Sequence, residues 1–223
     1  MGERQPPAEQ DQPDDVADAR GDADTPLSEE DVDPDPVRQF ERWFTEAEQA
    51  GAFQPEAAAV ATATPDGAPA VRIVLVKQTG PDGFVFYSNY ESRKGGELAA
   101  NPRAALMFHW EILGRVVRLE GPVQRTTREK SAAYAHTRPR GSQLSALASP
   151  QSRPIPSREW LEERAGELAE RHRDQVPLGE NWGGYRLTPE RFEFWQHRTS
   201  RMHDRLLYTP APDGGWRIER LAP

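Results

Sequence analysis

The stretch that decides the fold is residues 57–89, AAAVATATPDGAPAVRIVLVKQTGPDGFVFYSN. Its apolar runs are separated by the turn sequences Pro-Asp-Gly at 65–67 and Gly-Pro-Asp-Gly at 80–83. Short turns of this composition between apolar runs are typical of β-hairpins. The stretch therefore predicts three consecutive antiparallel strands, at 57–64, 70–78 and 84–89.

More strands are expected further along the chain. Beyond residue 100, short runs rich in valine, leucine and aromatic residues are bounded by proline, glycine and aspartate, a pattern that favours strands. The sequence Asp213-Gly214-Gly215 indicates a last hairpin turn. The further predicted strands are 104–110, 115–124, 184–187, 191–196, 205–208 and 216–221.

Helices are expected before and between these strands. Phe40, Trp43 and Phe44 recur at helical spacing, so residues 37–50 are predicted to form an amphipathic helix. The other predicted helices run from a Ser92 cap to Asn101, from a Thr126–Glu129 capping box through Ala135, and over residues 157–171. The pattern predicts a mainly β fold with flanking helices, an antiparallel barrel of at least seven strands.

The composition excludes several classes of protein. The chain has 223 residues, enough for one large domain. No apolar run approaches the roughly 18 to 20 residues of a membrane-spanning helix, and the N-terminus lacks the order of a secretion signal. The absence of cysteine excludes disulfides, thiolate metal sites and a cysteine nucleophile. We therefore expect a soluble, cytoplasmic protein.

The net charge of −8 is unevenly distributed. Residues 1–36 hold 13 acidic and 2 basic residues, whereas residues 37–223 hold 23 acidic and 26 basic residues. The first segment also contains six prolines and no aromatic residue, so it cannot bury enough apolar surface to offset its ordering entropy. We expect residues 1–35 to be a disordered acidic tail and residues 36–223 to fold. An acidic arm that docks on a basic partner is the alternative.

The strand at 72–77 carries two cations. Because side chains alternate along a strand, Arg72 and Lys77 point to opposite faces. A strand with charged ends is the simpler interpretation. The other is that each cation meets a different anionic group.

Two further blocks combine cations with hydroxyl groups. Ser92-Arg93-Lys94 opens a predicted short helix, whose N-terminus favours phosphate, although a solvated charged turn has the same composition. Tyr134 and Arg138 are four residues apart, and Ser142 follows. On a continuing helix, Tyr134 and Arg138 would share one face, as expected for a phosphate monoester site.

The last block is Arg201-Met202-His203-Asp204-Arg205. If this stretch is extended, Arg201, His203 and Arg205 share one face. Three such groups would repel one another unless an anion or a flat π-system lies among them. The histidines show no metal-ligand spacing, so no metal is expected. No nucleophile elbow, Walker loop or dinucleotide fingerprint is present either.

Taken in order, these blocks resemble the pyridoxine/pyridoxamine 5′-phosphate oxidase family. The resemblance covers residues 36–223. It is carried by Arg-Ile-Val-Leu-x-Lys at 72–77, Phe-Tyr-Ser-Asn at 86–89, Ser-Arg-Lys at 92–94, the 134–142 block, Gln-Ser at 151–152, Phe-Trp-Gln at 194–196, Arg-x-His-Asp-Arg at 201–205 and Arg-Leu-Ala-Pro at 220–223.

The resemblance implies a split-barrel flavin fold, FMN as cofactor and a homodimer with two active sites across its interface. The implied FMN contacts are Arg72, Ile73, Val74, Leu75, Val76, Lys77, Tyr87, Ser88, Arg93, Lys94, Gln151, Ser152, Trp195 and Arg205. The implied contacts to the substrate phosphate are Lys77, Tyr134, Arg138 and Ser142. Arg201 and His203 would hold the pyridine ring as the catalytic pair.

The activity that the resemblance implies is oxidation of pyridoxamine or pyridoxine 5′-phosphate to pyridoxal 5′-phosphate, with O2 reduced to hydrogen peroxide. A related flavin oxidase of secondary metabolism, similar to the phenazine-pathway enzymes, is one alternative. It is suggested by Val116, where the family usually has a flavin-contacting glutamine, and by the acidic residues 14–35 in place of a basic segment. A non-catalytic flavin-binding protein is the other alternative. No nucleic acid or membrane partner is expected.

Overall fold

The computed structural model describes residues 26–223 except residue 213. All three strands expected in the 57–89 stretch are present, as are the six further strands. Their bounds are β1 Ala57–Ala63, β2 Pro69–Gln78, β3 Phe84–Asn89, β4 Arg103–Trp110, β5 Arg115–Arg125, β6 Trp182–Leu187, β7 Arg191–Gln196, β8 Asp204–Pro210 and β9 Trp216–Arg220.

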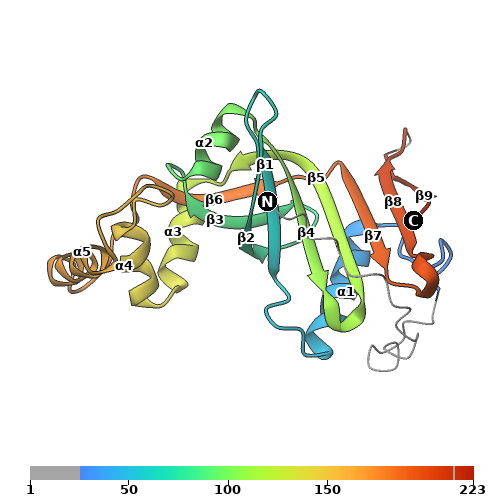
Figure 1. Ribbon diagram of the computed structural model, residues 1–223, viewed down its shortest axis with the longest axis horizontal. Helices are drawn as coiled ribbons and strands as arrows, with labels where there is room; N and C mark the ends of the chain where they lie inside the picture. Colours follow the sequence, from blue (N-terminus) through green and yellow to red (C-terminus); the bar gives the residue numbers. More distant parts are fainter. Residues whose placement is uncertain (1–25, 213) are drawn as a thin grey trace, which may run out of the picture.

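Six of these strands close into an antiparallel barrel. The strand order is β4-β1-β2-β3-β6-β5-β7-β8-β9, and an additional pairing of β4 with β5 closes the first six into a ring. The predicted antiparallel barrel is therefore confirmed. β7, β8 and β9 extend the sheet from β5 as an arm, which lies on the right in Figure 1.

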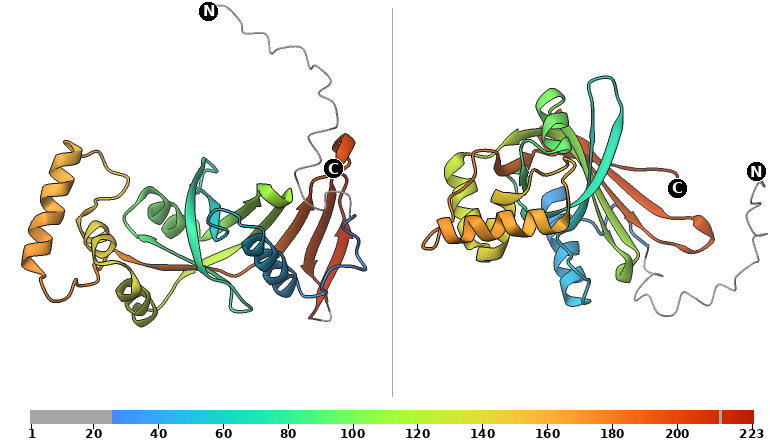
Figure 2. Two further views of the ribbon diagram at one scale, coloured as in Figure 1. Left: turned by 90° about the horizontal axis from the view of Figure 1, so that it is seen from below. Right: turned by 60° about the vertical axis from the view of Figure 1, so that its left-hand side comes forward.

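The helices flank the barrel. α1 Pro36–Gln49 begins at an Asp35 cap, whose side chain accepts a hydrogen bond from Val37 N, as expected at a helix start. α2 Arg93–Ala100 begins at the predicted Ser92 cap. Figure 2 shows the remaining helices together at the end of the molecule away from β8. They are α3 Arg128–Thr137, α4 Arg140–Ala148 and α5 Arg158–Arg171.

The predicted start of α3 was wrong by one residue. The cap is Thr127, whose side chain accepts from Lys130 N, and not Thr126. The Thr126 hydroxyl instead makes a hydrogen bond with the Ser131 hydroxyl at 2.9 Å. Thr126 is followed three residues later by Glu129, as in a capping box, whereas Thr127 is followed by Lys130. The capping-box spacing therefore favoured the wrong threonine.

The core joins α1 to the barrel. Phe40 and Trp43 are almost fully buried. The Phe40 ring lies 4.9 Å from both Phe84 and Phe108, and the Trp43 ring lies 5.2 Å from Phe194 on β7. Burying aromatic rings of this size supplies much of the stabilisation of a small barrel. The core therefore fixes β3, β4 and β7 relative to one another.

The folded part starts earlier than predicted. Leu27 and Val32 fall in the expected disordered tail, yet they are 5% and 7% exposed and belong to the core. Hydrogen bonds from distant residues hold this stretch in place, from Tyr208 to the Asp33 carbonyl and from Arg220 to the Leu27 carbonyl. The boundary predicted at residue 36 was therefore wrong for residues 26–35. Residues 1–25 of the expected tail lie outside the described residues.

In the part of the chain that the structure describes, no helix combines the length and the apolar character needed to span a membrane.

Candidate functional site: two groups of cations and aromatic rings

β2 presents its two cations on opposite sides. Along the strand, half-buried residues alternate with exposed ones, so Arg72, Val74 and Val76 face inward. Ile73, Leu75 and Lys77 face outward. The alternation predicted from the sequence is confirmed, because β1 pairs with this strand in regular antiparallel register.

Arg72 is held by a buried carboxylate that the sequence analysis missed. Its guanidinium donates to Glu97 Oε2 at 2.9 Å and to Thr62 Oγ1 at 2.6 Å. Arg93 Nε donates to the other Glu97 oxygen at 2.8 Å. Burial alone would raise the pKa of Glu97, but hydrogen bonds from Thr62 and both arginines outweigh it, so the pKa is lowered. Glu97 is therefore an anion that orients two cations.

Lys94 is a buried cation among neutral oxygens. It is 8% exposed, and its Nζ donates to Ser88 Oγ at 2.8 Å and to Gln151 Oε1 at 2.8 Å. Burial, and next the nearby Arg72, lower its pKa to about 8. Three residues that the resemblance assigned to one cofactor, Ser88, Lys94 and Gln151, thus meet at one point, although they come from β3, α2 and the loop after α4.

These groups together carry a net positive charge that suits a bound phosphate. Arg72, Arg93 and Lys94 contribute three positive charges, and Glu97 contributes one negative charge, which leaves a net charge of +2. The ammonium of Lys94 and the first turn of α2 add donors without a competing acid. A phosphate dianion would neutralise this charge. We therefore call Arg72, Ser88, Arg93, Lys94 and Gln151 the phosphate cluster.

A stack of aromatic rings lies next to this cluster. Tyr87 stacks on Tyr134 with ring centroids 3.9 Å apart, and Trp182 lies parallel to both at 5.5 Å and 6.3 Å. The Tyr87 hydroxyl is buried without a hydrogen-bond partner among the described residues. A buried donor of this kind is costly unless a ligand or water satisfies it.

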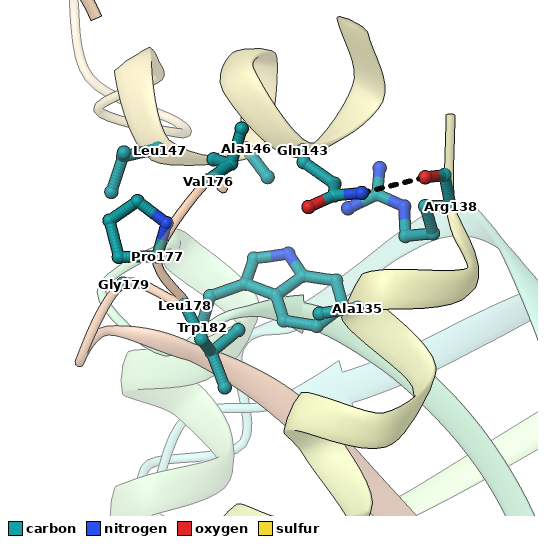
Figure 3. A pocket seen from close by; sticks show the side chains of 10 residues that line it. All are labelled: Ala135, Arg138, Gln143, Ala146, Leu147, Val176, Pro177, Leu178, Gly179 and Trp182. Carbon is teal, nitrogen blue, oxygen red and sulfur yellow. Dashed lines mark hydrogen bonds between the residues drawn. The ribbon is translucent and has the colours of Figure 1, made fainter. Parts of the chain in front are cut away.

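Arg138 extends this stack into a cavity. Its guanidinium lies over the Trp182 ring at 5.1 Å from the centroid, a cation–π contact. Figure 3 shows both side chains lining a small cavity of about 20 Å³ between α3, α4 and the chain before β6. Gln143 donates from Nε2 to the Arg138 carbonyl at 2.8 Å and so holds the backbone there.

The helical spacing used for this block was wrong. α3 ends at Thr137, and Arg138 has extended backbone geometry, because the residue before a proline is disfavoured in a helix. A second helix, α4, which the sequence analysis did not predict, then begins at Arg140 and carries Ser142. Tyr134 and Arg138 nevertheless meet at Trp182, which the analysis had not singled out.

Lys77 has an acidic partner. Its Nζ lies 2.9 Å from Glu56 Oε1, and each side chain is a little over one quarter exposed. The hydrogen bond from Lys77 lowers the pKa of Glu56 and outweighs the effect of burial, which alone would raise it. Lys77 is therefore separated from the phosphate cluster and already paired.

A second group of side chains surrounds the ends of β7 and β8. The His203 ring lies 4.6 Å from Trp195 and 5.2 Å from His197. Burial, and next the nearby His197 and Arg201, lower the pKa of His203, so the ring is neutral at pH 7. Its Nδ1 accepts a hydrogen bond from Arg198 N at 3.1 Å, which leaves the proton on Nε2.

Arg205 is anchored next to this ring. It pairs across the strands with Trp195, and its Nε donates to the buried carboxylate of Glu193 at 2.9 Å. Glu193 also pairs with Arg118 on β5. We call Trp195, Arg201, His203 and Arg205 the β7–β8 group.

The extended geometry expected for residues 201–205 was only partly correct. β8 begins at Asp204, whereas Thr199–Arg201 form a 3₁₀ turn in which Ser200 and Arg201 have φ near +54° and +58°. Arg201 therefore does not share a strand face with His203 and Arg205. Left-handed geometry at two adjacent non-glycine residues is strained and is typical of functional loops.

The phosphate cluster and the β7–β8 group lie apart within one chain. β3 and β7 are separated by β6 and β5 in the sheet order. In Figure 1, and again in the left view of Figure 2, α2 lies near the centre of the molecule and β8 toward the right-hand end. One chain alone does not bring together the residues that the resemblance assigned to one cofactor.

Comparison with known proteins gives a consistent result. Residues 44–172 match the family model described as pyridoxamine 5′-phosphate oxidase, and residues 182–223 match the pyridoxine 5′-phosphate oxidase C-terminal dimerisation region. The chain is 54% identical over 209 residues, 93% of its length and 99% of the relative's, to pyridoxine/pyridoxamine 5′-phosphate oxidase 1 of Ralstonia nicotianae. It is 57% identical to the corresponding oxidase of Rubrobacter xylanophilus, over 88% of this chain and 91% of the relative.

A solved structure is also similar along nearly the whole chain. It is PhzG from Burkholderia lata in complex with tetrahydrophenazine-1-carboxylic acid, with a TM-score of 0.84 and 29% identity. The match covers 90% of this chain and 98% of that one.

Proposed function

The chain belongs to the pyridoxine/pyridoxamine 5′-phosphate oxidase family, and from this premise we propose that it is an FMN-dependent oxidase. Its substrates are pyridoxamine 5′-phosphate or pyridoxine 5′-phosphate, and its product is pyridoxal 5′-phosphate. O2 is reduced to hydrogen peroxide. The observation that carries this proposal is the identity of 54% to a named oxidase over 93% of the chain.

The phosphate cluster fits the cofactor that this activity needs. Its net charge of +2 matches a phosphate dianion, and among the described residues the hydrogen-bond partners of Lys94 are neutral oxygens. The FMN contacts would be Arg72, Ile73, Val74, Leu75, Val76, Lys77, Tyr87, Ser88, Arg93, Lys94, Gln151, Ser152, Trp195 and Arg205. FMN, when bound, supplies the redox chemistry, by accepting a hydride equivalent and passing the electrons to O2.

The substrate is anchored by its phosphate and its ring. The substrate phosphate would be held by Tyr134, Arg138, Ser142 and Lys77. To bind it, the Lys77 ammonium would leave its hydrogen bond to Glu56. Arg201 and His203 would lie over the pyridine. Because the Arg198 amide holds the proton of His203 on Nε2, that atom would donate a hydrogen bond to an oxygen of the substrate. These residues would hold the substrate next to the cofactor in the orientation that the reaction needs.

A homodimer completes the site. The outer face of β2 is apolar and exposed, with Val71 at 70% and Ile73 at 67%, and Met107 of β4 adds to it at 40%. A large exposed apolar surface of this kind favours association, and the chain contains a dimerisation region. In the dimer, the phosphate cluster of one protomer is completed by the β7–β8 group of its partner.

The test is an aerobic assay of the FMN-loaded protein. We expect pyridoxamine 5′-phosphate to yield pyridoxal 5′-phosphate, ammonia and hydrogen peroxide, with one water consumed per turnover. Pyridoxine 5′-phosphate should yield the aldehyde and peroxide alone. Pyridoxamine without its phosphate is the control, and equal rates with and without the phosphate would contradict the proposed anchoring.

One observation favours a second candidate function. The similarity to PhzG, with a TM-score of 0.84, makes oxidation of a reduced phenazine carboxylic acid the alternative. The same assay separates the two, because a phenazine precursor carries no phosphate for Tyr134, Arg138 and Ser142. The chain is an enzyme in either case, so a non-catalytic flavin-binding protein is not proposed.

A further inference from the structure

The segment Leu27–Asp33 is fastened to the arm that carries His203. Leu27 and Val32 are buried in the core, and Tyr208 of β8 donates from its hydroxyl to the Asp33 carbonyl at 2.9 Å. The segment lies beside β8 and β9 in Figure 1 and in the left view of Figure 2. We call Leu27–Asp33 the N-terminal clasp.

Arg220 of β9 joins the clasp to the start of β8. It binds Glu29 through two contacts, Nε to Oε1 at 3.1 Å and Nη2 to Oε2 at 2.7 Å. It also donates to the Leu27 carbonyl at 2.8 Å and to Asp204 Oδ1 at 2.7 Å. Two parallel contacts between a guanidinium and a carboxylate fix orientation as well as distance.

Asp204 is held from both of its oxygens. Oδ1 accepts from Arg220, and Oδ2 accepts from Leu27 N at 3.1 Å. Arg198 Nε lies 3.6 Å from Oδ2. Glu29 and Asp204 are the acids of this network, and Arg198 and Arg220 are its cations. Glu29 and Leu27 link it to the N-terminal part of the chain.

This anchoring matters because Asp204 stands between His203 and Arg205. On its N-terminal side the backbone is irregular, with left-handed geometry at Ser200 and Arg201. Regular pairing of β8 with β7 begins only at Asp204, opposite Gln196. The position of the loop that carries Arg201 and His203 therefore depends on how firmly Asp204 is held.

We propose that Glu29 is a positioning residue for the substrate site, acting through Arg220 and Asp204 on the loop that carries Arg201 and His203. Glu29 itself does not touch substrate or cofactor. The inference rests on the proposed function, because it takes Arg201 and His203 to be the residues that hold the pyridine ring. The acidic residue Glu29 of the clasp then serves to hold the substrate-binding loop in position.

The test compares Glu29→Gln with Glu30→Gln in the full-length, FMN-loaded protein. Both variants remove one acidic charge from the same segment, but Glu30 is exposed and forms no ion pair with the described residues. We expect Glu29→Gln to raise KM for pyridoxamine 5′-phosphate about two- to fivefold, the range for a partly exposed ion-pair network. The kcat and the Kd for FMN should change less than about twofold, since uniform binding is what is lost.

A second measurement does not depend on turnover. Amide hydrogen exchange in residues 198–206 should be faster in Glu29→Gln than in the wild type and in Glu30→Gln, with exchange elsewhere unchanged. If Glu29→Gln matches Glu30→Gln in both KM and exchange, the inference is overturned. If exchange is faster in Glu29→Gln but the wild type oxidises no phosphorylated pyridine, the proposed function is overturned, whereas the role of Glu29 in holding the loop stands.

Discussion

The buried cation Lys94 gives the sharpest prediction. We expect Lys94→Met to weaken FMN binding while leaving the apoprotein at least as stable as the wild type at pH 7. The two effects have opposite signs because the same ammonium is costly to bury alone and useful once a phosphate is bound. A residue with a purely structural role would lower both properties together.

The magnitudes follow from the pKa of Lys94. Lowering it from 10.5 to about 8 corresponds to about 3 kcal/mol that the charged form costs the fold, at about 1.4 kcal/mol per pKa unit. The pKa in the folded state lies below the unfolded value, so this cost is fully present below pH 8 and disappears as the pH rises toward 10.5. Lys94→Met also loses three hydrogen bonds, to Ser88, to Gln151 and, at 3.3 Å, to Ser92. This offsets about 1 kcal/mol for each of the two short contacts and less for the long one.

The effect on FMN follows from the contact that is lost. A hydrogen bond to a charged group contributes about 1.5–3 kcal/mol, so Lys94→Met should raise the Kd for FMN about 10- to 150-fold. In the wild type, the Kd should also rise above pH 8, because binding then requires proton uptake by Lys94. Lys94→Arg should remove this rise, since a guanidinium stays charged.

The assay is titration of apoprotein with FMN, followed by quenching of flavin fluorescence, at several pH values from neutral to alkaline. Urea unfolding of the same apoproteins gives their free energies of unfolding. An unchanged Kd in Lys94→Met, or a loss of apoprotein stability larger than the loss of FMN affinity, would refute the reasoning.

Three further predictions concern other parts of the chain. Arg201→Ala should reduce kcat/KM for pyridoxamine 5′-phosphate at least tenfold, about 1.4 kcal/mol or more, with FMN retention unchanged, and equal losses of both would refute its role. Glu56→Gln should lower KM about two- to fivefold, because Lys77 no longer has to leave an acidic partner, and a raised KM would contradict that exchange. Deleting residues 1–25 should leave the melting temperature within about 2 °C of the wild type. Deleting residues 1–34 removes the buried Leu27 and should lower the melting temperature by several degrees. Equal melting temperatures of the two deletion variants would refute the observed boundary.

The sequence was informative where local rules act alone. The alternation along β2 placed Arg72 and Lys77 on opposite faces, and the Ser92 cap was located correctly. Both features depend only on residues adjacent in the chain, namely strand periodicity and the preference of serine for a helix start. Glu97 carried a local signal too, since it lies four residues after Arg93 on a short helix, and that spacing was not used.

The sequence was less informative where distant residues act. The burial of Leu27 depends on Arg220, 193 residues away, which supplies a donor to its carbonyl. Arg138 meets Trp182 through tertiary packing and not through helix periodicity. The left-handed geometry at Ser200 and Arg201 was not anticipated either, because the stretch was taken as extended although serine is a residue type that favours turns.

The central claim is that the chain holds a flavin at the phosphate cluster and oxidises a phosphorylated pyridine with it. Its most direct test is anaerobic mixing of the FMN-loaded protein with pyridoxamine 5′-phosphate, while the visible absorption of the oxidised flavin is followed. We predict that the absorption is lost in step with formation of the aldehyde and returns when air is admitted. Flavin that stays oxidised with this substrate, but is bleached by an unphosphorylated reduced aromatic acid, would contradict the account.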